Sequence, residues 1–308
     1  MKLSSDRRVT GAWKGWALAV ATAICATFPV FAVAQEITTV KPGVLTVVVY
    51  PFMPHISNDN GKLVGLDGDL LNDAAAKLGL TIEAQDADFA GALAAVQAGR
   101  ADIVVGNVSW TAQRAEAGLF TDPPYYASTV LIQKPGANIE KVADLEGHAV
   151  GYLSGALQAK AVPTIPGATP RAYPTIDAGL LDVAAGRVAG FFTQPLVAAY
   201  AVQANPRLGN ELRPVTLAPP TAAELEKYPD WQLFNPFQGG WYTSKNSQAL
   251  VDKLNEIIRT YYESGFAAET VKKWGGDPEL FLKPVLPLFE DQRHGVDRPD
   301  DWKAPSIE

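Results

Sequence analysis

Two stretches of the chain repeat one helix–turn–strand pattern, and this repeat limits the possible folds more than any other feature. Residues 89–107 read FAGALAAVQAGRADIVVGN, and residues 176–194 read IDAGLLDVAAGRVAGFFTQ. Each helical stretch ends at Ala-Gly-Arg, and a short apolar run then leads to an amide side chain. Eight steps separate Gly99 from Asn107, and eight separate Gly186 from Gln194. The repeat indicates two similar α/β units, although helix–glycine–strand also recurs as an ordinary α/β turn.

Strand and helix patterns alternate around both copies. Apolar, β-branched runs at 44–50, 80–84 and 101–106 predict strands, and the periodicity at 67–78 and 89–98 predicts helices. Around the second copy, strands are expected at 149–153 and 188–193 and helices at 176–185 and 195–202. Two further helices are expected at 248–263 and 271–274. This alternation predicts a parallel sheet flanked by helices in each unit. In open sheets of this kind ligands bind beyond the carboxyl ends of the strands, where Asn107 and Gln194 are expected.

The first 34 residues have the pattern of an export signal. Basic residues precede an apolar run over 16–33, and they are Lys2, Arg7, Arg8 and Lys14. The run ends at Ala32-Val33-Ala34, the small-x-small pattern that a signal peptidase cleaves. We therefore expect cleavage after Ala34 and a periplasmic protein. A retained membrane anchor is the alternative, because the run is long enough to span a bilayer.

Charge and composition exclude several classes of protein. Cleavage would remove four basic residues and one acidic residue, which leaves 22 basic and 32 acidic residues and a net charge of −10. A chain this acidic lacks the basic footprint of DNA or RNA binding, so no nucleic-acid partner is expected. The single cysteine, Cys25, lies in the export signal, and the chain has three histidines. We therefore expect no disulfide and no structural zinc site. The protein is also expected to be a monomer and to carry no cofactor.

Four motifs, in one order along the chain, carry a resemblance to a known family. They are GKLVGLDGDL at 61–70, DF at 88–89, SWTAQR at 109–114 with FTDPPYY at 120–126, and the stretch 186–200 from Gly-Arg to Tyr. Over about residues 43–276 the chain resembles the periplasmic solute-binding proteins of polar amino-acid ABC importers, the bacterial extracellular solute-binding proteins of family 3. The ordered set is specific, whereas any one motif alone would be weak.

The resemblance implies an α/β chain with the two-lobed periplasmic-binding-protein fold of type II, in which two crossing strands join two parallel-core sheets. Lobe 1 is expected at 43–131 and 243–276, lobe 2 at 135–238, and an irregular C-terminal tail at 284–308. The implied function is that of an extracytoplasmic solute-binding subunit of an ABC importer, which is not an enzyme. Such a subunit closes on a small carboxylate-bearing ligand and is then recognised by a membrane permease. An amino acid, a modified amino acid and an organic acid are all candidate ligands.

Arg114 is the strongest candidate for binding that carboxylate. A guanidinium presents a fork of donors that matches a carboxylate in two hydrogen bonds. Arg114 follows an expected helix start at Thr111, where free N–H groups favour anions, and Ser109 adds a hydroxyl donor. The family's matching arginine holds the ligand's carboxylate. A surface arginine on a polar turn is the alternative.

The remaining site residues come from the resemblance and from the strand ends. Phe89 and Phe52 match aromatic residues of the family, although Tyr50 and Met53 compete with Phe52 for the position and Phe89 suits a core role equally well. Asn107 ends the first repeated strand. In the second lobe the loop Ser154-Gly155-Ala156-Leu157-Gln158 matches a ligand-binding loop, in which we select Gly155, Ala156 and Gln158, together with Gln194 at the end of the second repeated strand.

Two departures from the family pattern narrow the ligand class. Relatives that bind amino acids usually place an aspartate for the ligand's α-ammonium where this chain has Gln194. A neutral amide does not neutralise a buried cation, and an unpaired buried charge is costly. In the loop, Ala156 and Leu157 replace hydroxyl residues, although backbone N–H groups there could still bind an anion. We therefore expect a carboxylate with an apolar or aromatic body and no strong need for an ammonium partner.

An enzyme on the same fold, such as a periplasmic cyclohexadienyl-type dehydratase, is the rival hypothesis. It would need a general acid or base in the cleft, and His55 is the histidine nearest an expected cleft loop. We interpret Asp67 and Asp69 as a helix cap and a surface charge rather than paired catalytic carboxylates. No Ser-His-Asp pattern or metal-ligand spacing is present in the sequence.

Overall fold

The computed structural model describes residues 36–126, 128–235, 239–284 and 302–307. The predicted signal peptide, 1–34, lies outside the described residues, and so does most of the predicted tail. Residues 302–307 have no regular secondary structure and contact the first lobe. There the Tyr126 hydroxyl donates to the Pro305 carbonyl at 2.6 Å. No helix in the described part of the chain combines the length and apolarity needed to cross a membrane.

The first lobe is built on a mixed sheet with the strand order β4-β1-β5-β12-β6. Its strands are β1 (Val44–Val49), β4 (Thr81–Asp86), β5 (Ile103–Ser109), β6 (Gly118–Phe120) and β12 (Gly239–Ser244). β1 pairs in parallel with β4 and β5, while β12 runs antiparallel between β5 and β6. The run VLTVVV forms the buried strand β1 because both of its faces are covered. A small hairpin of β2 (Ser57–Asp59) and β3 (Lys62–Val64) precedes the first helix.

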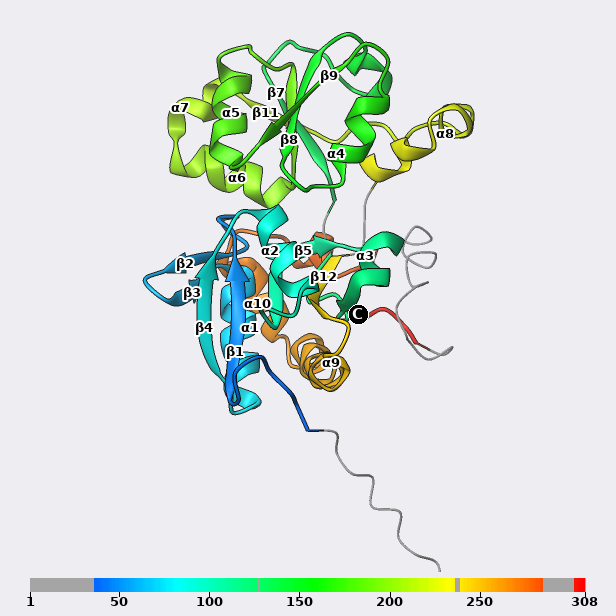
Figure 1. The fold of residues 1–308 in the computed structure, drawn as a ribbon. Coiled ribbons are helices and arrows are strands. Elements are labelled where there is room, and N and C mark those ends of the chain that lie inside the picture. The colour runs from blue at the N-terminus through cyan, green and yellow to red at the C-terminus, as the bar shows by residue number, and fades with distance from the viewer. Residues whose placement is uncertain (1–35, 127, 236–238, 285–301, 308) are drawn as a thin grey trace, which may run out of the picture. The chain divides into compact units, whose positions relative to one another are not determined.

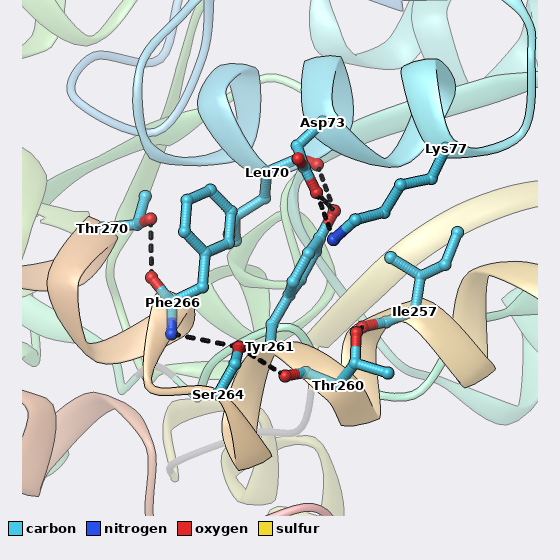
Figure 2. A network of polar contacts seen from close by, with 9 residues as sticks. All are labelled: Leu70, Asp73, Lys77, Ile257, Thr260, Tyr261, Ser264, Phe266 and Thr270. Carbon is cyan, nitrogen blue, oxygen red and sulfur yellow. Dashed lines mark hydrogen bonds and ion pairs between the residues drawn. The ribbon is translucent and has the colours of Figure 1, made fainter.

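Helices surround this sheet (Figure 1). They are α1 (Leu66–Lys77), α2 (Phe89–Gln97), α3 (Ala112–Ala117), α9 (Gln248–Glu263), α10 (Phe266–Lys273) and α11 (Pro278–Phe281). Figure 2 shows how α9 is attached to α1. The Tyr261 hydroxyl donates to the Leu70 carbonyl at 3.0 Å and to Asp73 at 2.6 Å, and the Lys77 ammonium lies over the Tyr261 ring. The Phe266 ring at the start of α10 packs against Tyr261, so the C-terminal helices complete the first lobe.

The second lobe is built on a sheet with the order β11-β7-β10-β8-β9. Its strands are β7 (Val130–Gln133), β8 (Ala149–Leu153), β9 (Thr169–Tyr173), β10 (Gly190–Thr193) and β11 (Arg213–Val215). β8 pairs in parallel with β9 and β10, whereas β7 is antiparallel to β10 and β11. The helical segments of this lobe are η1 (Val142–Leu145), α4 (Gln158–Ala161), η2 (Val162–Thr164), α5 (Ile176–Ala184), α6 (Pro195–Ala204), α7 (Pro206–Glu211), α8 (Ala222–Lys227) and η3 (Pro229–Phe234).

The repeat in the sequence is a structural repeat. α2 with β5 and α5 with β10 form the same helix–glycine–strand unit, and each unit lies in a different sheet. Each sheet also contains one strand that is antiparallel to its neighbours, and this strand follows a passage of the chain from the other lobe. The predicted two-lobed α/β fold with parallel-core sheets is therefore confirmed.

The lobe boundaries differ slightly from those expected. β7 pairs within the second sheet, so residues 130–131 move from the first lobe to the second. β12 pairs within the first sheet, so residues 239–242 move to the first lobe. The passages between the lobes include residues 127 and 236–238, which lie outside the described part of the chain. α10 begins at Phe266, five residues before the helix expected at 271–274, because its first turn is fixed by packing of Phe266 on Tyr261.

Candidate functional site at the strand ends of both sheets

A cavity of about 50 Å³ brings together most of the predicted site residues. Its lining draws on both lobes, and it includes Phe52, Phe89, Asn107, Ser109, Ala156, Gln158 and Gln194. These residues follow strand ends in both sheets, as the rule for open α/β sheets predicts. Gly155 and Arg114 line a neighbouring, larger cavity of about 900 Å³, which shares Ala156 and Leu157 with the small one.

Local backbone geometry directs Asn107 into the small cavity. Gly106 has φ +107° and Asn107 has φ +52°, a left-handed conformation that asparagine tolerates better than most residues. A Cβ on Gly106 would lie 2.6 Å from the Tyr50 hydroxyl, which donates to the Gly106 carbonyl at 2.8 Å. A side chain on Gly239 would overlap the Asn107 amide. Two glycines and one tyrosine therefore fix the position of this amide.

Several polar atoms in the small cavity lack hydrogen-bond partners among the described residues and can bond a ligand. Asn107 is 2% exposed, and within the described residues neither its Oδ1 nor its Nδ2 has a hydrogen-bond partner. The same holds for Oε1 of Gln194, which precedes α6, and for the Thr193 hydroxyl beside it. Buried polar atoms are rarely left unpaired, because each loses its hydrogen bonds to water. Amide and hydroxyl groups from both lobes are therefore available to the same molecule.

Arg114 lines the larger cavity, and its guanidinium lies over Phe89 of the small one. Thr111 caps α3 by accepting the Arg114 N–H at 3.1 Å, so the predicted helix start is observed. The guanidinium donates to the Ser109 carbonyl and, from the other lobe, to the Gly155 carbonyl, both at 2.8 Å. Burial lowers the pKa of Arg114 to about 10, and the group remains a cation at neutral pH. Arg114 thus stands as a half-buried cation between the lobes rather than on a solvent-exposed turn.

The loop of the second lobe approaches the first lobe closely. Gly155 has φ +80°, and a Cβ there would lie 3.2 Å from atoms of Ala90 in α2. Ala156 lines both cavities, but its N–H already donates to the Leu153 carbonyl at 2.9 Å. This N–H is therefore occupied, as is that of Ser154, which donates to the Tyr173 carbonyl at 2.8 Å.

Aromatic rings form the first-lobe wall of the small cavity. Tyr50 lies between the rings of Phe52 and Phe89, with centroids at 5.4 and 4.7 Å. The Arg114 guanidinium carbon is 5.4 Å from the centre of the Phe89 ring, within cation–π range. Phe89 therefore both packs in the core and faces the cavity. From the sequence, Tyr50 was an alternative to Phe52 for a single aromatic position, whereas the side chains of both residues line the cavity.

Several lining residues had no signal in the sequence. They are Thr129, Leu153, Ile176, Phe192 and Thr193. Four of them belong to the predicted strands and helices of the second lobe, so their core-like patterns concealed that they face a cavity. Thr129 precedes β7 at a passage between the lobes, and no motif marks that position.

Titratable groups suited to acid–base chemistry lie away from the small cavity. No histidine, aspartate or glutamate occurs among the described residues that line it. His55 is fully buried, and burial lowers its pKa to about 3. Asp67 is buried in the first turn of α1 and bonds Tyr125 and Trp241, so its expected role as a helix cap is wrong. In the described part of the chain, no cluster of acidic, histidine or cysteine side chains could hold a metal ion.

Fold and site together define a two-lobed binding protein of the periplasmic type. Residues 45–277 match the bacterial extracellular solute-binding proteins, family 3, and the chain belongs to that family.

Two curated relatives illustrate the similarity. A probable amino-acid-binding protein of Bacillus subtilis, YxeM, is 32% identical over 45% of this chain and 53% of its own length. The chain thus spans about half the length of that relative. The arginine-binding protein 1 of an Escherichia coli ABC transporter is 25% identical over 70% of this chain and 83% of its own.

The similarity extends to solved structures. An ancestral arginine-binding protein bound to arginine has a TM-score of 0.65 and 27% identity, over 76% of this chain and 99% of that one. The substrate-binding protein of an amino acid ABC transporter has a TM-score of 0.64 and 25% identity, over 75% and 98% of the two chains.

Proposed function

We propose that the chain is the extracytoplasmic solute-binding subunit of an ABC importer and that it closes on a small carboxylate-bearing ligand. One observation carries the proposal: strand-end amides from two separate sheets, Asn107 and Gln194, line one cavity with unpaired polar atoms, and Arg114 stands beside it. Family membership supports the same role. The partner that receives the ligand is a membrane permease.

The charge beside the small cavity favours a monoanionic ligand, since Lys160 and Asp230 of the larger cavity pair with each other at 3.0 Å. Arg114 supplies a cation that matches a carboxylate in two hydrogen bonds. Gln194 and Asn107 contribute neutral amides, and the described lining of the small cavity contains no carboxylate for an α-ammonium group. A buried ammonium would therefore lose its hydration without gaining a counter-charge. Leu153, Ile176 and Phe192 provide an apolar surface for the body of the ligand.

A matched pair of ligands tests this ligand class. L-Phenylalanine and 3-phenylpropanoate differ only in the α-ammonium group, and the same comparison is made with other amino acids and their deaminated acids. Isothermal titration should give tighter binding for at least one acid than for its amino acid. An Arg114→Ala variant should lose that binding. Tight binding of a standard amino acid that survives Arg114→Ala would contradict the proposal.

The reciprocal variant is Gln194→Asp. It restores a carboxylate at the position where relatives pair with the ammonium, so the preference should move from the acid towards the amino acid. Gln158→Glu is the matched control, because Gln158 lines the same cavity from the second lobe but begins α4, whereas Gln194 precedes α6. If the wild-type chain and Gln194→Asp show the same preference for the acid over the amino acid, Gln194 does not determine the ligand specificity.

The proposal also places the protein in the periplasm. The signal peptide is cleaved after Ala34, and the mature protein is a monomer that meets its permease at the membrane. The intact mass of the protein from a periplasmic fraction should correspond to a chain beginning at Gln35. Light scattering should give the mass of one chain. A mass that includes residues 1–34 would favour the retained anchor.

The proposal assigns no catalysis to the site. A dehydratase would need a general acid or base beside the ligand. His55 is buried behind Phe52, and the described lining of the small cavity offers amides, hydroxyls and apolar groups. Incubation with a cyclohexadienyl carboxylate should leave that compound unchanged, and release of an aromatic product would establish the enzymatic alternative.

A further inference from the structure

A buried carboxylate of the first lobe joins several parts of the site. Asp67 is 0% exposed and lies in the first turn of α1. Its Oδ1 accepts the Trp241 indole N–H at 2.5 Å, and its Oδ2 accepts the Tyr125 hydroxyl. The backbone N–H of Gly106 also faces this carboxylate and lowers its pKa. Asp67 itself does not line either cavity described above.

Two of these donors lie close to the passages between the lobes. Tyr125 is two residues before residue 127, where the chain leaves the first lobe. Trp241 lies near the start of β12, just after the chain returns through 236–238. One carboxylate therefore holds the first-lobe ends of both passages. The third donor, Gly106, directly precedes the cavity amide of Asn107, so the same carboxylate also fixes a strand end that faces the ligand.

A fourth connection reaches the aromatic wall through His55. When Asp67 is ionised, the Tyr125 hydroxyl donates its single proton to this carboxylate. At the Tyr125–His55 contact of 2.7 Å, Nδ1 of His55 must therefore be the donor, which selects its Nδ1–H tautomer. The His55 ring stacks on Phe52 with centroids 5.2 Å apart, and Phe52 lines the small cavity.

We propose that Asp67 is a positioning residue of the binding site, whose buried carboxylate couples the ligand-facing wall of the first lobe to both passages between the lobes. This inference rests on the proposed function, because it assigns a role to the relative movement of the lobes. A change in the relative position of the lobes acts on Tyr125 and Trp241, and the shared carboxylate transmits it to Gly106 and to the Phe52 loop.

The role requires a carboxylate rather than another small polar group. Three N–H or O–H groups point at Asp67, and an ionised carboxylate accepts from all of them. An asparagine has one acceptor oxygen and an NH₂ group that would face a donor. The Tyr125 hydroxyl would have to accept from this NH₂ and donate to His55, and the histidine would change to its Nε2–H tautomer. Asp67→Asn therefore alters the network with little change in volume.

The first test follows the histidine. Long-range ¹H–¹⁵N spectra distinguish the two neutral tautomers of an imidazole, and the chain has three histidines, so His55 is assigned by a His55→Gln variant. At a pH well above 7, where Asp67 is ionised, we expect a protonated Nδ1 in the wild-type chain and a protonated Nε2 in Asp67→Asn. Asp69→Asn is the matched control, because Asp69 lies two residues along α1 and bonds Lys273 and Trp274 instead. It should leave the tautomer unchanged.

The second test measures the lobes without any ligand. Cysteines replace the exposed residues Lys62 in β3 and Arg171 in β9 of a Cys25→Ser chain, and spin labels report the distance between the lobes. Asp67→Asn should broaden this distance distribution, whereas Asp69→Asn should not. Tyr125→Phe removes one donor and keeps the ring, and Trp241→Phe removes the other donor and keeps a smaller aromatic ring. Each should broaden the distribution partly even if Asp67→Asn fails to fold.

These readouts separate the inference from the proposed function. Unchanged distance distributions in folded Asp67→Asn, Tyr125→Phe and Trp241→Phe would overturn the coupling role even if the chain binds carboxylates as proposed. An unchanged His55 tautomer in Asp67→Asn would overturn the connection to the Phe52 loop. Conversely, failure of every carboxylate to bind would contradict the proposed function while the two structural readouts still decide the role of Asp67.

Discussion

Replacing Asp67 by asparagine should change how the stability of the protein depends on pH. Burial raises the pKa of Asp67 to about 7, against hydrogen bonds from Tyr125, Trp241 and Gly106 that lower it. The folded protein therefore binds this proton more tightly than the unfolded chain does. The resulting stabilisation is complete below pH 3.8, the ordinary pKa of an aspartate, and is lost as the pH rises towards 7.

His55 has the opposite effect on how the stability of the folded protein depends on pH. Burial lowers its pKa from 6.5 to about 3, so between these values the unfolded chain binds a proton that the folded protein does not. The contribution of His55 to the free energy of unfolding is present above pH 6.5 and is lost as the pH falls towards 3. The other titratable groups of this cluster are Tyr50 and Tyr125. Burial raises the pKa of both, so they stay neutral throughout this range.

The two contributions have similar slopes of opposite sign. For each pH unit in which the proton is bound in only one of the folded and unfolded states, the free energy of unfolding changes by about 1.4 kcal/mol. Between about pH 4 and pH 6.5 the Asp67 and His55 slopes cancel in the wild-type protein. In Asp67→Asn the His55 slope remains alone, so the variant should lose about 3 kcal/mol more than the wild type between pH 6.5 and pH 4.

Urea unfolding followed by tryptophan fluorescence at half-unit steps of pH measures this difference. The comparison uses the slope of the free energy of unfolding against pH. A destabilisation that is the same at every pH therefore does not affect the result. Asp69→Asn should follow the wild-type curve, because its side chain bonds Lys273 and Trp274 outside the buried cluster. Parallel curves for the wild type and Asp67→Asn would refute the assignment of opposing proton linkage to these two groups.

Three further substitutions test the site and the packing around it. Arg114→Lys keeps a positive charge but loses the fork that bonds a carboxylate in two places, so titration should show binding of the preferred carboxylate weakened by about tenfold or more. Gly179→Ala places a methyl group into the Phe191 ring within the second lobe, and urea unfolding should show a loss of about 1–3 kcal/mol. Asp88→Ala removes the cap that accepts the Gly91 N–H at 2.6 Å and should cost about 1 kcal/mol, whereas unchanged stability would mean that water replaces the cap.

Local patterns were sufficient to predict the regular elements that lie in the cores. β8 and α9 have the predicted bounds, and α2 and α5 end within one residue of them. Each of these elements has a continuous apolar run or a helical period that does not depend on distant residues. The edge strand β9 was not predicted, because its largely exposed TPRAY sequence contains a proline and gains its strand geometry by pairing with β8.

The nine residues predicted for the site all line one of the two cavities. The motif around Ser109 and Arg114, and the amides at the ends of the repeated strands, were recognisable because each lies at a fixed place in a local pattern. Asp67 was misinterpreted for the same reason. A carboxylate at the start of a helix has the local signature of a cap, whereas its partners Tyr125 and Trp241 lie 58 and 174 residues away.

By itself, the sequence determined that the chain forms two α/β units of the same design, with an amide at the end of a strand in each. Short-range periodicity, glycine positions and apolar runs are properties of neighbouring residues, so they can be read along the chain. Only the tertiary structure decided that Asn107 and Gln194 line one cavity, that Gly155 meets Arg114, and that Asp67 is buried. Those facts depend on how distant segments pack together, and the packing is determined by long-range contacts that no local pattern records.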